Sequence, residues 1–210
     1  MERTTYLKSL PDDCKFQHSI REHIEYRLDS YDVKEKLEYP KPENLDNYDA
    51  IILTGSAASA YENLQWINLL VAYIASVAEE KPHIKLIGAF AFYSENIQQM
   101  HRDHIPEVPK SCHLLASTSI TPNQGFIRLN SSAPPPNASS PVDLKDIQIF
   151  TVQGHPEFTK PIVSTIVDAR SATGVIDQAT AELARSRADW PNDGVDKLGK
   201  VIWGIMSAKA

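Results

Sequence analysis

The sequence predicts an α/β domain of the doubly wound type with a mostly parallel sheet, and three neighbouring segments support this prediction. Residues 50–53 form a continuous apolar run that Thr-Gly-Ser stops, and residues 84–92, IKLIGAFAF, form a second one. Such runs are typical of strands buried on both faces of a parallel sheet. Residues 62–80 between them have the periodicity of a helix. A strand, a helix and a strand over about 45 residues form a βαβ unit, which joins parallel strands.

The helix predicted over residues 62–80 has one wide apolar face, whose members recur at spacings of three and four. They are Trp66, Leu69, Leu70, Tyr73, Ile74 and Val77. We expect this face to pack on the sheet rather than to hold a cofactor. Trp203, near the C-terminus, is expected to anchor a last helix on the domain.

The rest of the chain is predicted to add three strands and three helices to this unit, which together form an α/β domain. Strands are predicted over residues 113–120, 125–129 and 147–154, and helices over residues 19–28, 160–174 and 178–190. Thr159 is suited to the N-cap of the helix that follows it, and Gly174 is suited to the position after its end. Residues 30–48 are charged and contain two prolines, so we expect a short strand at most, then a loop. Residues 130–143, NSSAPPPNASSPVD, predict a flexible Pro/Ser-rich loop.

Size and composition predict one domain spanning residues 1–210. The net charge is −6, with acidic and basic residues mixed, which argues against a surface for nucleic acid. The sequence contains no run of about 18 apolar residues, so no membrane span is predicted. The N-terminus, MERTTYLKSLPDD, has no apolar region typical of a secretory signal. Together with the two cysteines, Cys14 and Cys112, this predicts reduced thiols and a cytoplasmic location.

The segment TVQGHPEF, residues 151–158, places His155 and Glu157 just after a predicted strand. A histidine and a carboxylate at such a point are typical of two members of a catalytic triad. An alternative is that the pair is a structural feature that caps the helix after it. The sequence His101-Arg102-Asp103-His104 also has a spacing seen among metal ligands, but a structural or solvent-facing role is favoured and no metal is predicted.

Four stretches in this order resemble the class I glutamine amidotransferases, in particular the short stand-alone fungal and bacterial members. They are YDAIILTGSAASAYE (48–62), IKLIG (84–88), NIQQMHRDHIPEVP (96–109) and FTVQGHPEF (150–158). The tail NDGVDKLGKVIWGIM (192–206) is also similar to the family. The resemblance covers roughly residues 45–205. It implies a three-layer, flavodoxin-like fold and a place in fungal secondary metabolism.

The resemblance also implies a reaction, the hydrolysis of the glutamine side-chain amide and transfer of its nitrogen. A cysteine thiolate attacks the amide, ammonia leaves, and water releases glutamate from a thioester. By position in the motifs, His155 would be the base and Glu157 the residue that orients it. Gly55 and Ser56 would lie in the loop that helps to form the oxyanion hole. His101 and Asp103 would line the glutamine pocket, no cofactor is needed, and a partner synthetase or acceptor enzyme would take the ammonia.

The sequence departs from the family at the nucleophile. The family continues from the strand as Gly-Ile-Cys-Phe-Gly-His-Gln, whereas this chain reads Gly-Ala-Phe-Ala-Phe-Tyr-Ser. Phe90 therefore stands at the position of the cysteine and Phe92 at that of the glycine that permits the tight turn. Only a few residues separate this point from the segment that contains His101, and residues 1–14 lack the family's first apolar strand. We therefore expect a partly truncated sheet and marginal stability.

Three other residues are weak substitutes for the missing nucleophile. Cys14 precedes the first helix, Cys112 begins a strand beside His113, and Ser94 follows the crowded segment, and none has an elbow glycine. Two hypotheses remain. In the first, the protein is an enzyme that uses another nucleophile, or whose transcript contains a further segment that restores Gly-x-Cys-x-Gly. In the second, it is a non-catalytic relative that binds a small molecule or a regulatory partner. Phe90 favours the second hypothesis and predicts that catalysis is impaired.

Overall fold

The computed structural model describes residues 27–56, 58, 62–88, 104–118, 121–134 and 142–208. The predicted helix at residues 19–28 falls almost wholly outside these ranges, as do the predicted strand beyond Gly88 and the middle of the Pro/Ser-rich loop.

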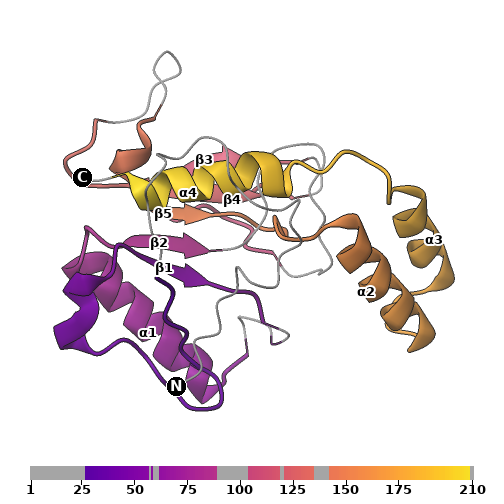
Figure 1. Ribbon diagram of the computed structural model, residues 1–210, viewed down its shortest axis with the longest axis horizontal. Coiled ribbons are helices and arrows are strands. Elements are labelled where there is room, and N and C mark those ends of the chain that lie inside the picture. Colours follow the sequence, from indigo (N-terminus) through magenta and orange to yellow (C-terminus); the bar gives the residue numbers. More distant parts are fainter. Residues whose placement is uncertain are drawn as a thin grey trace. The chain divides into compact units, whose positions relative to one another are not determined.

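The described elements begin with the predicted strand–helix–strand unit, continue with three more strands and end with three helices (Figure 1). The strands are β1 (Ala50–Leu53), β2 (Lys85–Gly88), β3 (His113–Ala116), β4 (Gly125–Leu129) and β5 (Ile147–Thr151). The helices are α1 (Gln65–Glu80), α2 (Lys160–Ala172), α3 (Gln178–Ser186) and α4 (Gly199–Ser207). Two short 3-10 helices, Pro42–Asn47 and Leu144–Asp146, and a π-helical turn, Gly194–Leu198, complete them.

The five strands form one mixed sheet in the order β1-β2-β5-β4-β3. The first strands are parallel, as the βαβ unit predicts. The last part is antiparallel, because β3 pairs with β4 in the register His113 opposite Ile127, with an irregularity before Ala116. The three-layer α/β architecture expected from the sequence is confirmed by a solved structure of the same fold, described below.

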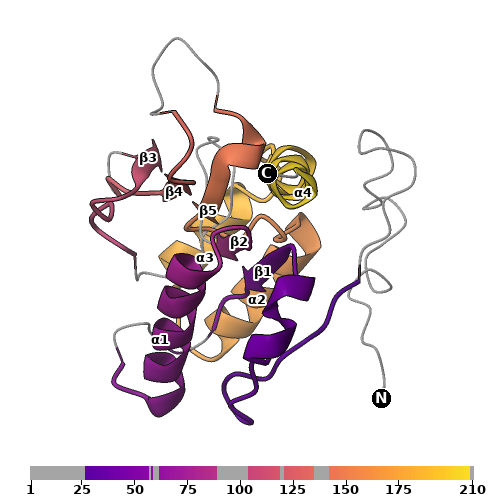
Figure 2. The same cartoon turned by 90° about the vertical axis from the view of Figure 1, so that its left-hand side faces the viewer.

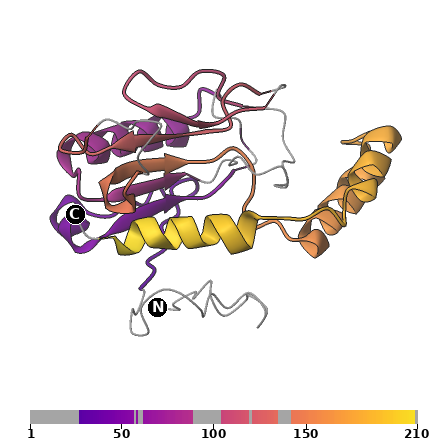
Figure 3. The ribbon, with the colours of Figure 1, turned by 90° about the horizontal axis from the view of Figure 1, so that it is seen from above.

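The chain divides into two compact units, and each is described by itself. The first comprises the described residues up to Ile87, Leu129–Ile149 and the residues from Ile202 onward. Its core gathers Leu45, Val77, Ala78, Ile84 and Leu86, with Ile51, Tyr73, Ile74 and Ile149 packed against them. In this unit α1 and the later part of α4 lie on opposite faces of the strands (Figure 2; Figure 3).

The second unit comprises Gly88–Arg128 and Phe150–Val201. Its helices α2 and α3 lie side by side (Figure 1). Val163, Val167 and Ala181 are buried between them, with Phe158 and Ile176 packed against the cluster. Gly174 follows α2 with a φ of +73°, the left-handed conformation that the sequence predicted after this helix. Thr159 does occupy the N-cap, but its side chain makes no capping hydrogen bond.

Three local predictions are corrected by the structure. The side chain of Ile52 is 43% exposed, so β1 is not buried on both faces. β1 is an outer strand of this sheet, and alternate residues face opposite sides, so Ile51 packs on the core while Ile52 does not. Leu69 is 42% exposed, because the buried side chains of α1 are Ile67, Val77 and Ala78, and Leu69, two residues after Ile67, lies on the other side of the helix. Residues 30–48 contain no strand, which the prediction of a short strand at most allows, but the predicted loop contains the 3-10 helix Pro42–Asn47.

Candidate functional site

The candidate site begins where the backbone leaves β5. Beyond the strand, Val152 N donates to Gly88 O (3.1 Å) and Gln153 N donates to Gln124 O (3.1 Å), so the backbone remains tied to its neighbours. The chain then turns, and Phe158 N donates to His155 O (3.0 Å) to close the turn. Pro156 is buried inside it. The turn therefore presents His155 and Glu157 from a fixed stretch of backbone.

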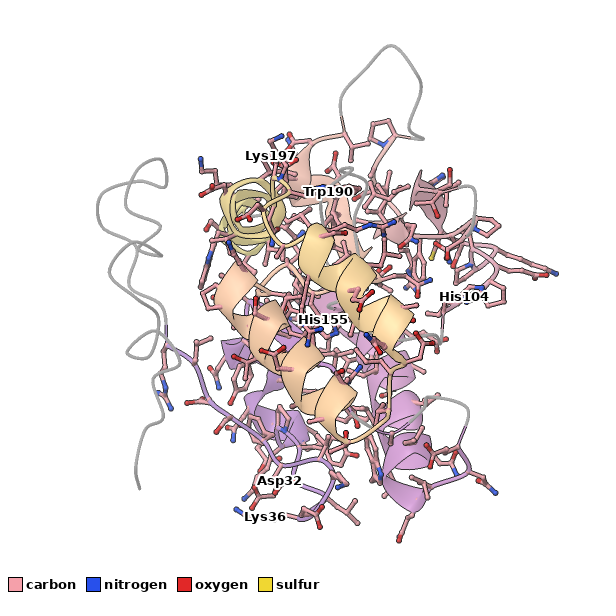
Figure 4. All side chains as sticks on the ribbon, turned by 90° about the vertical axis from the view of Figure 1, so that its right-hand side faces the viewer. Asp32, Lys36, His104, His155, Trp190 and Lys197 are labelled. Carbon is pink, nitrogen blue, oxygen red and sulfur yellow. The ribbon has the colours of Figure 1, made fainter. Side chains whose placement is uncertain are left out.

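His155 and Glu157 form a direct pair in this turn. Nδ1 of His155 lies 2.9 Å from Oε1 of Glu157, and the two side chains are 19% and 56% exposed. The ring of Phe158 stacks on the His155 ring, with centroids 3.9 Å apart and planes inclined by 8°. Figure 4 labels His155, which precedes α2 in the chain. With the proton on Nδ1 donated to the carboxylate, Nε2 is the ring atom that can accept a proton from a nucleophile.

A buried amide network lies immediately before the pair. Gln153 is 3% exposed and Asn123 is 1% exposed. Nε2 of Gln153 donates to Asn123 O (2.7 Å) and Ile105 O (3.2 Å), and its Oε1 accepts from Ile105 N (3.3 Å). Nδ2 of Asn123 in turn donates to Glu107 O (3.3 Å). The sequence patterns described above did not predict this network. The available signal was a glutamine two residues before the histidine, within the strand predicted over residues 147–154.

A second feature that the sequence did not predict is the contact of the turn with the residues Asn192 and Gly194. Nδ2 of Asn192 donates to Phe158 O (2.5 Å), and Oδ1 of Asn192 accepts from Gly194 N (2.8 Å). The backbone of Gly194 approaches Pro156 so closely that an added Cβ would lie 2.4 Å from Pro156 O. The signal was the Asn-Asp-Gly sequence at the start of the similar tail.

None of the predicted substrate-binding residues is a described residue of the second unit, which holds the pair. Gly55 and Ser56 are exposed in the first unit, where Ser56 Oγ accepts from Ala58 N (3.1 Å). Phe90, His101 and Asp103 lie outside the described residues. So do Cys14 and Ser94, two of the alternative nucleophiles.

Cys112 has neither the place nor the ionisation of a nucleophile for His155. Gln124 N donates to Ala116 O (2.8 Å) and Gln124 O accepts from Gln153 N (3.1 Å), so Ala116 and Gln153 lie at one level of the sheet. Cys112 lies four residues before Ala116, roughly 12 Å along the strand on one side of this level. His155 follows Gln153 and lies on the opposite side of the level. Burial raises the pKa of the Cys112 thiol, against smaller opposing effects of Ser111 and Arg128.

The described residues contain no group of three or more His, Cys, Asp and Glu side chains placed to hold a metal ion. Their helices include none with the length and apolar character needed to cross a membrane.

Similar proteins and one solved structure place the chain in context. A glutamine amidotransferase-like protein of Schizosaccharomyces pombe is 29% identical, over 78% of this chain and 75% of that protein. Gamma-glutamyl peptidase 3 of Arabidopsis thaliana is 23% identical, over 71% of this chain and 70% of that protein. The crystal structure of a glutamine amidotransferase from Thermotoga maritima matches with a TM-score of 0.55 and 14% identity, covering 80% of this chain and 81% of that one. No protein-family model matches the chain.

Proposed function

We propose that this chain, which belongs to the glutamine amidotransferase-like family, recognises glutamine or a related γ-glutamyl amide but is impaired in its hydrolysis. His155 is the base of the site, Glu157 orients it, and Phe90 stands where the family has its thiol. Gly55, Ser56, His101 and Asp103 are the residues we assign to substrate binding. No metal or cofactor is part of this proposal.

One observation carries the proposal: the His155–Glu157 pair is assembled while the described cysteine is distant from it. The 2.9 Å contact between Nδ1 and Oε1 holds the tautomer that a base requires. A base of this kind acts by removing a proton from a thiol or hydroxyl. Phenylalanine has no such proton, and the Cys112 thiol lies at another level of the sheet. The pair therefore has nothing to activate at the expected position.

The reaction of the family shows what is lost with the thiol. The sulfur attacks the amide carbon of glutamine, the C–N bond breaks, and ammonia leaves with a proton from the histidine. Water then attacks the thioester, and glutamate and the free thiol are released. Without the sulfur, neither the bond to the amide carbon nor the thioester forms. What the scaffold can still contribute is binding of the amide.

Glutamate release from glutamine by the purified protein tests the proposal. We expect none above the background of the His155→Ala variant, and we expect glutamine to bind both proteins in calorimetry. Release that depends on His155 would overturn the proposed impairment and direct the search to Cys14, Cys112 and Ser94 through single Ser or Ala replacements. Absence of binding by folded protein would overturn glutamine recognition.

Restoring the family residues provides a second arm. Phe90→Cys alone leaves a bulky side chain at residue 92, so we expect little activity from it. Phe90→Cys combined with Phe92→Gly restores the thiol and the small residue of the turn, and we expect glutamate release that His155→Ala abolishes. The transcript is a further check, because an in-frame exon between Gly88 and Asn96 would restore the family's longer segment.

Further predictions concern the location, partner and pathway of the protein. We propose a cytoplasmic location, a synthetase or acceptor enzyme as partner, and a place in fungal secondary metabolism. A non-catalytic binding or regulatory role is the alternative that Phe90 favours. Co-purification of a defined enzyme with the tagged protein, undisturbed by His155→Ala, would support the regulatory role over nitrogen transfer.

A further inference from the structure

We propose that Asn192 and Gly194 are positioning residues, which set the geometry of the His155–Glu157 pair from the tail of the chain. The inference rests on the proposed function only in taking this pair as the site. It assigns a role to a segment that begins 35 residues after Glu157. All the contacts involved lie within the second unit.

A hydrogen bond joins the side chain of Asn192 to the end of the turn. Nδ2 donates to Phe158 O at 2.5 Å, while Oδ1 accepts from Gly194 N at 2.8 Å. One side chain therefore fixes both the turn after Glu157 and its own loop. Phe158 is the residue whose ring stacks on His155, so its backbone position also sets the face of the imidazole.

The backbone of Gly194 closely approaches Pro156, the middle residue of the turn. An added Cβ would lie 2.4 Å from Pro156 O, 2.8 Å from Pro156 Cα and 2.9 Å from Pro156 C. All three are backbone atoms, which cannot rotate away as a side-chain end can. Pro156 joins the two members of the pair, so a side chain at residue 194 would displace the peptide units that carry them.

The Asn192–Gly194 loop is itself held in place by hydrogen bonds to the residues that follow it. Asp193 O accepts from Lys197 N (3.0 Å) and Leu198 N (3.2 Å), and Leu198 is 3% exposed. Lys197 Nζ also lies 3.0 Å from Asp193 Oδ2. Figure 4 labels Lys197 and His155. The loop is thus tied to a buried leucine and can act as a fixed support for the turn.

The proton position on His155 tests the proposal without any substrate. Long-range ¹H–¹⁵N spectra of labelled protein distinguish a ring protonated at Nδ1 from one protonated at Nε2. We expect the unmodified protein to hold Nδ1–H, and Glu157→Gln to shift the spectrum by weakening the acceptor. We expect Asn192→Ala and Gly194→Ala to shift the same His155 signals in the same direction.

Matched controls separate positioning from a general loss of structure. Asn130→Ala removes another amide-to-carbonyl bond, from Nδ2 to Lys145 O, and Gly204→Ala introduces a contact with a leucine side chain. Neither should move the His155 signals. If Asn192→Ala does not fold, Asn192→Asp keeps the acceptor for Gly194 N and removes only the donor to Phe158 O.

Unchanged His155 signals in folded Asn192→Ala or Asn192→Asp would overturn the inference. So would an equal shift in the Asn130→Ala control. Glutamate release by the unmodified protein would overturn the proposed impairment but leave the positioning role intact. The two proposals therefore fail by different measurements.

Discussion

The side-chain amide of Gln153 joins two segments that precede it by 30 and 48 residues: its Nε2 donates to Asn123 O at 2.7 Å and also to Ile105 O. Its Oε1 accepts from Ile105 N, so three backbone groups depend on one buried side chain. Buried backbone groups are costly to leave without partners. Gln153 thus holds two loops against the strand that leads to His155.

Replacing Gln153 with leucine should be strongly destabilising. The substitution leaves three partly or fully buried backbone groups without a partner, and we expect a loss of about 3 kcal/mol in the free energy of unfolding. Urea denaturation of Gln153→Leu measures it. Gln178→Leu removes an exposed glutamine and should change the stability by less than about 0.5 kcal/mol. A loss of the same size in both variants would refute the special role of Gln153.

The Cys112 thiol should react slowly at neutral pH. Burial raises its pKa above the ordinary value of 9.0, and the thiolate is the reactive form. We expect alkylation by iodoacetamide to accelerate as the pH rises past 9, and to be much slower at pH 7 than for a free cysteine peptide. Mass mapping of the modified peptide separates Cys112 from Cys14. Fast reaction at neutral pH would contradict this assignment and reopen Cys112 as a nucleophile.

Lys85 should make stability depend on alkaline pH. It is 3% exposed, its Nζ donates to Lys145 O (2.6 Å), and burial lowers its pKa below the ordinary 10.5, with Asp146 opposing. Between the lowered folded pKa and 10.5 the unfolded chain binds more protons, so the free energy of unfolding should rise with pH. Lys85→Met should show a flatter profile in urea unfolding at pH 8, 9 and 10. The control Lys200→Met, at an exposed lysine, should leave the slope of the free energy of unfolding against pH unchanged. The same unchanged slope in Lys85→Met would show that Lys85 does not cause the pH dependence.

Gly174 should resist substitution because its φ is +73°. No atom lies near an added Cβ, so backbone conformation alone decides the cost. We expect Gly174→Ala to lower the stability by about 1 kcal/mol and Gly174→Asn to lower it less, since asparagine tolerates this region better. Thermal melts of the two variants provide the comparison. Equal stability of Gly174→Ala and the unmodified protein would show that the turn relaxes to a negative φ.

Local patterns were sufficient where the chain's own periodicity decides the structure. The apolar run at residues 50–53, the helix ending at Glu80 and the glycine after α2 were all predictable, because burial, periodicity and backbone freedom are written in adjacent residues. The same patterns misjudged Ile52 and Leu69. Their exposure depends on what covers a strand face or a helix flank, which is decided by distant segments.

Some features of the candidate site were likewise predictable from the sequence, and others arise only when the chain folds. The sequence by itself determined that His155 and Glu157 follow a strand and that the chain resembles the amidotransferases, and it predicts that Phe90 stands at the position of the family's thiol. Only the tertiary structure decided that Gln153 ties Ile105 and Asn123 to that strand, and that Asn192 and Gly194 support the turn. The physical reason is that a hydrogen bond or a close backbone approach needs two partners within a few ångströms. Folding brings such partners together from positions that no local periodicity relates.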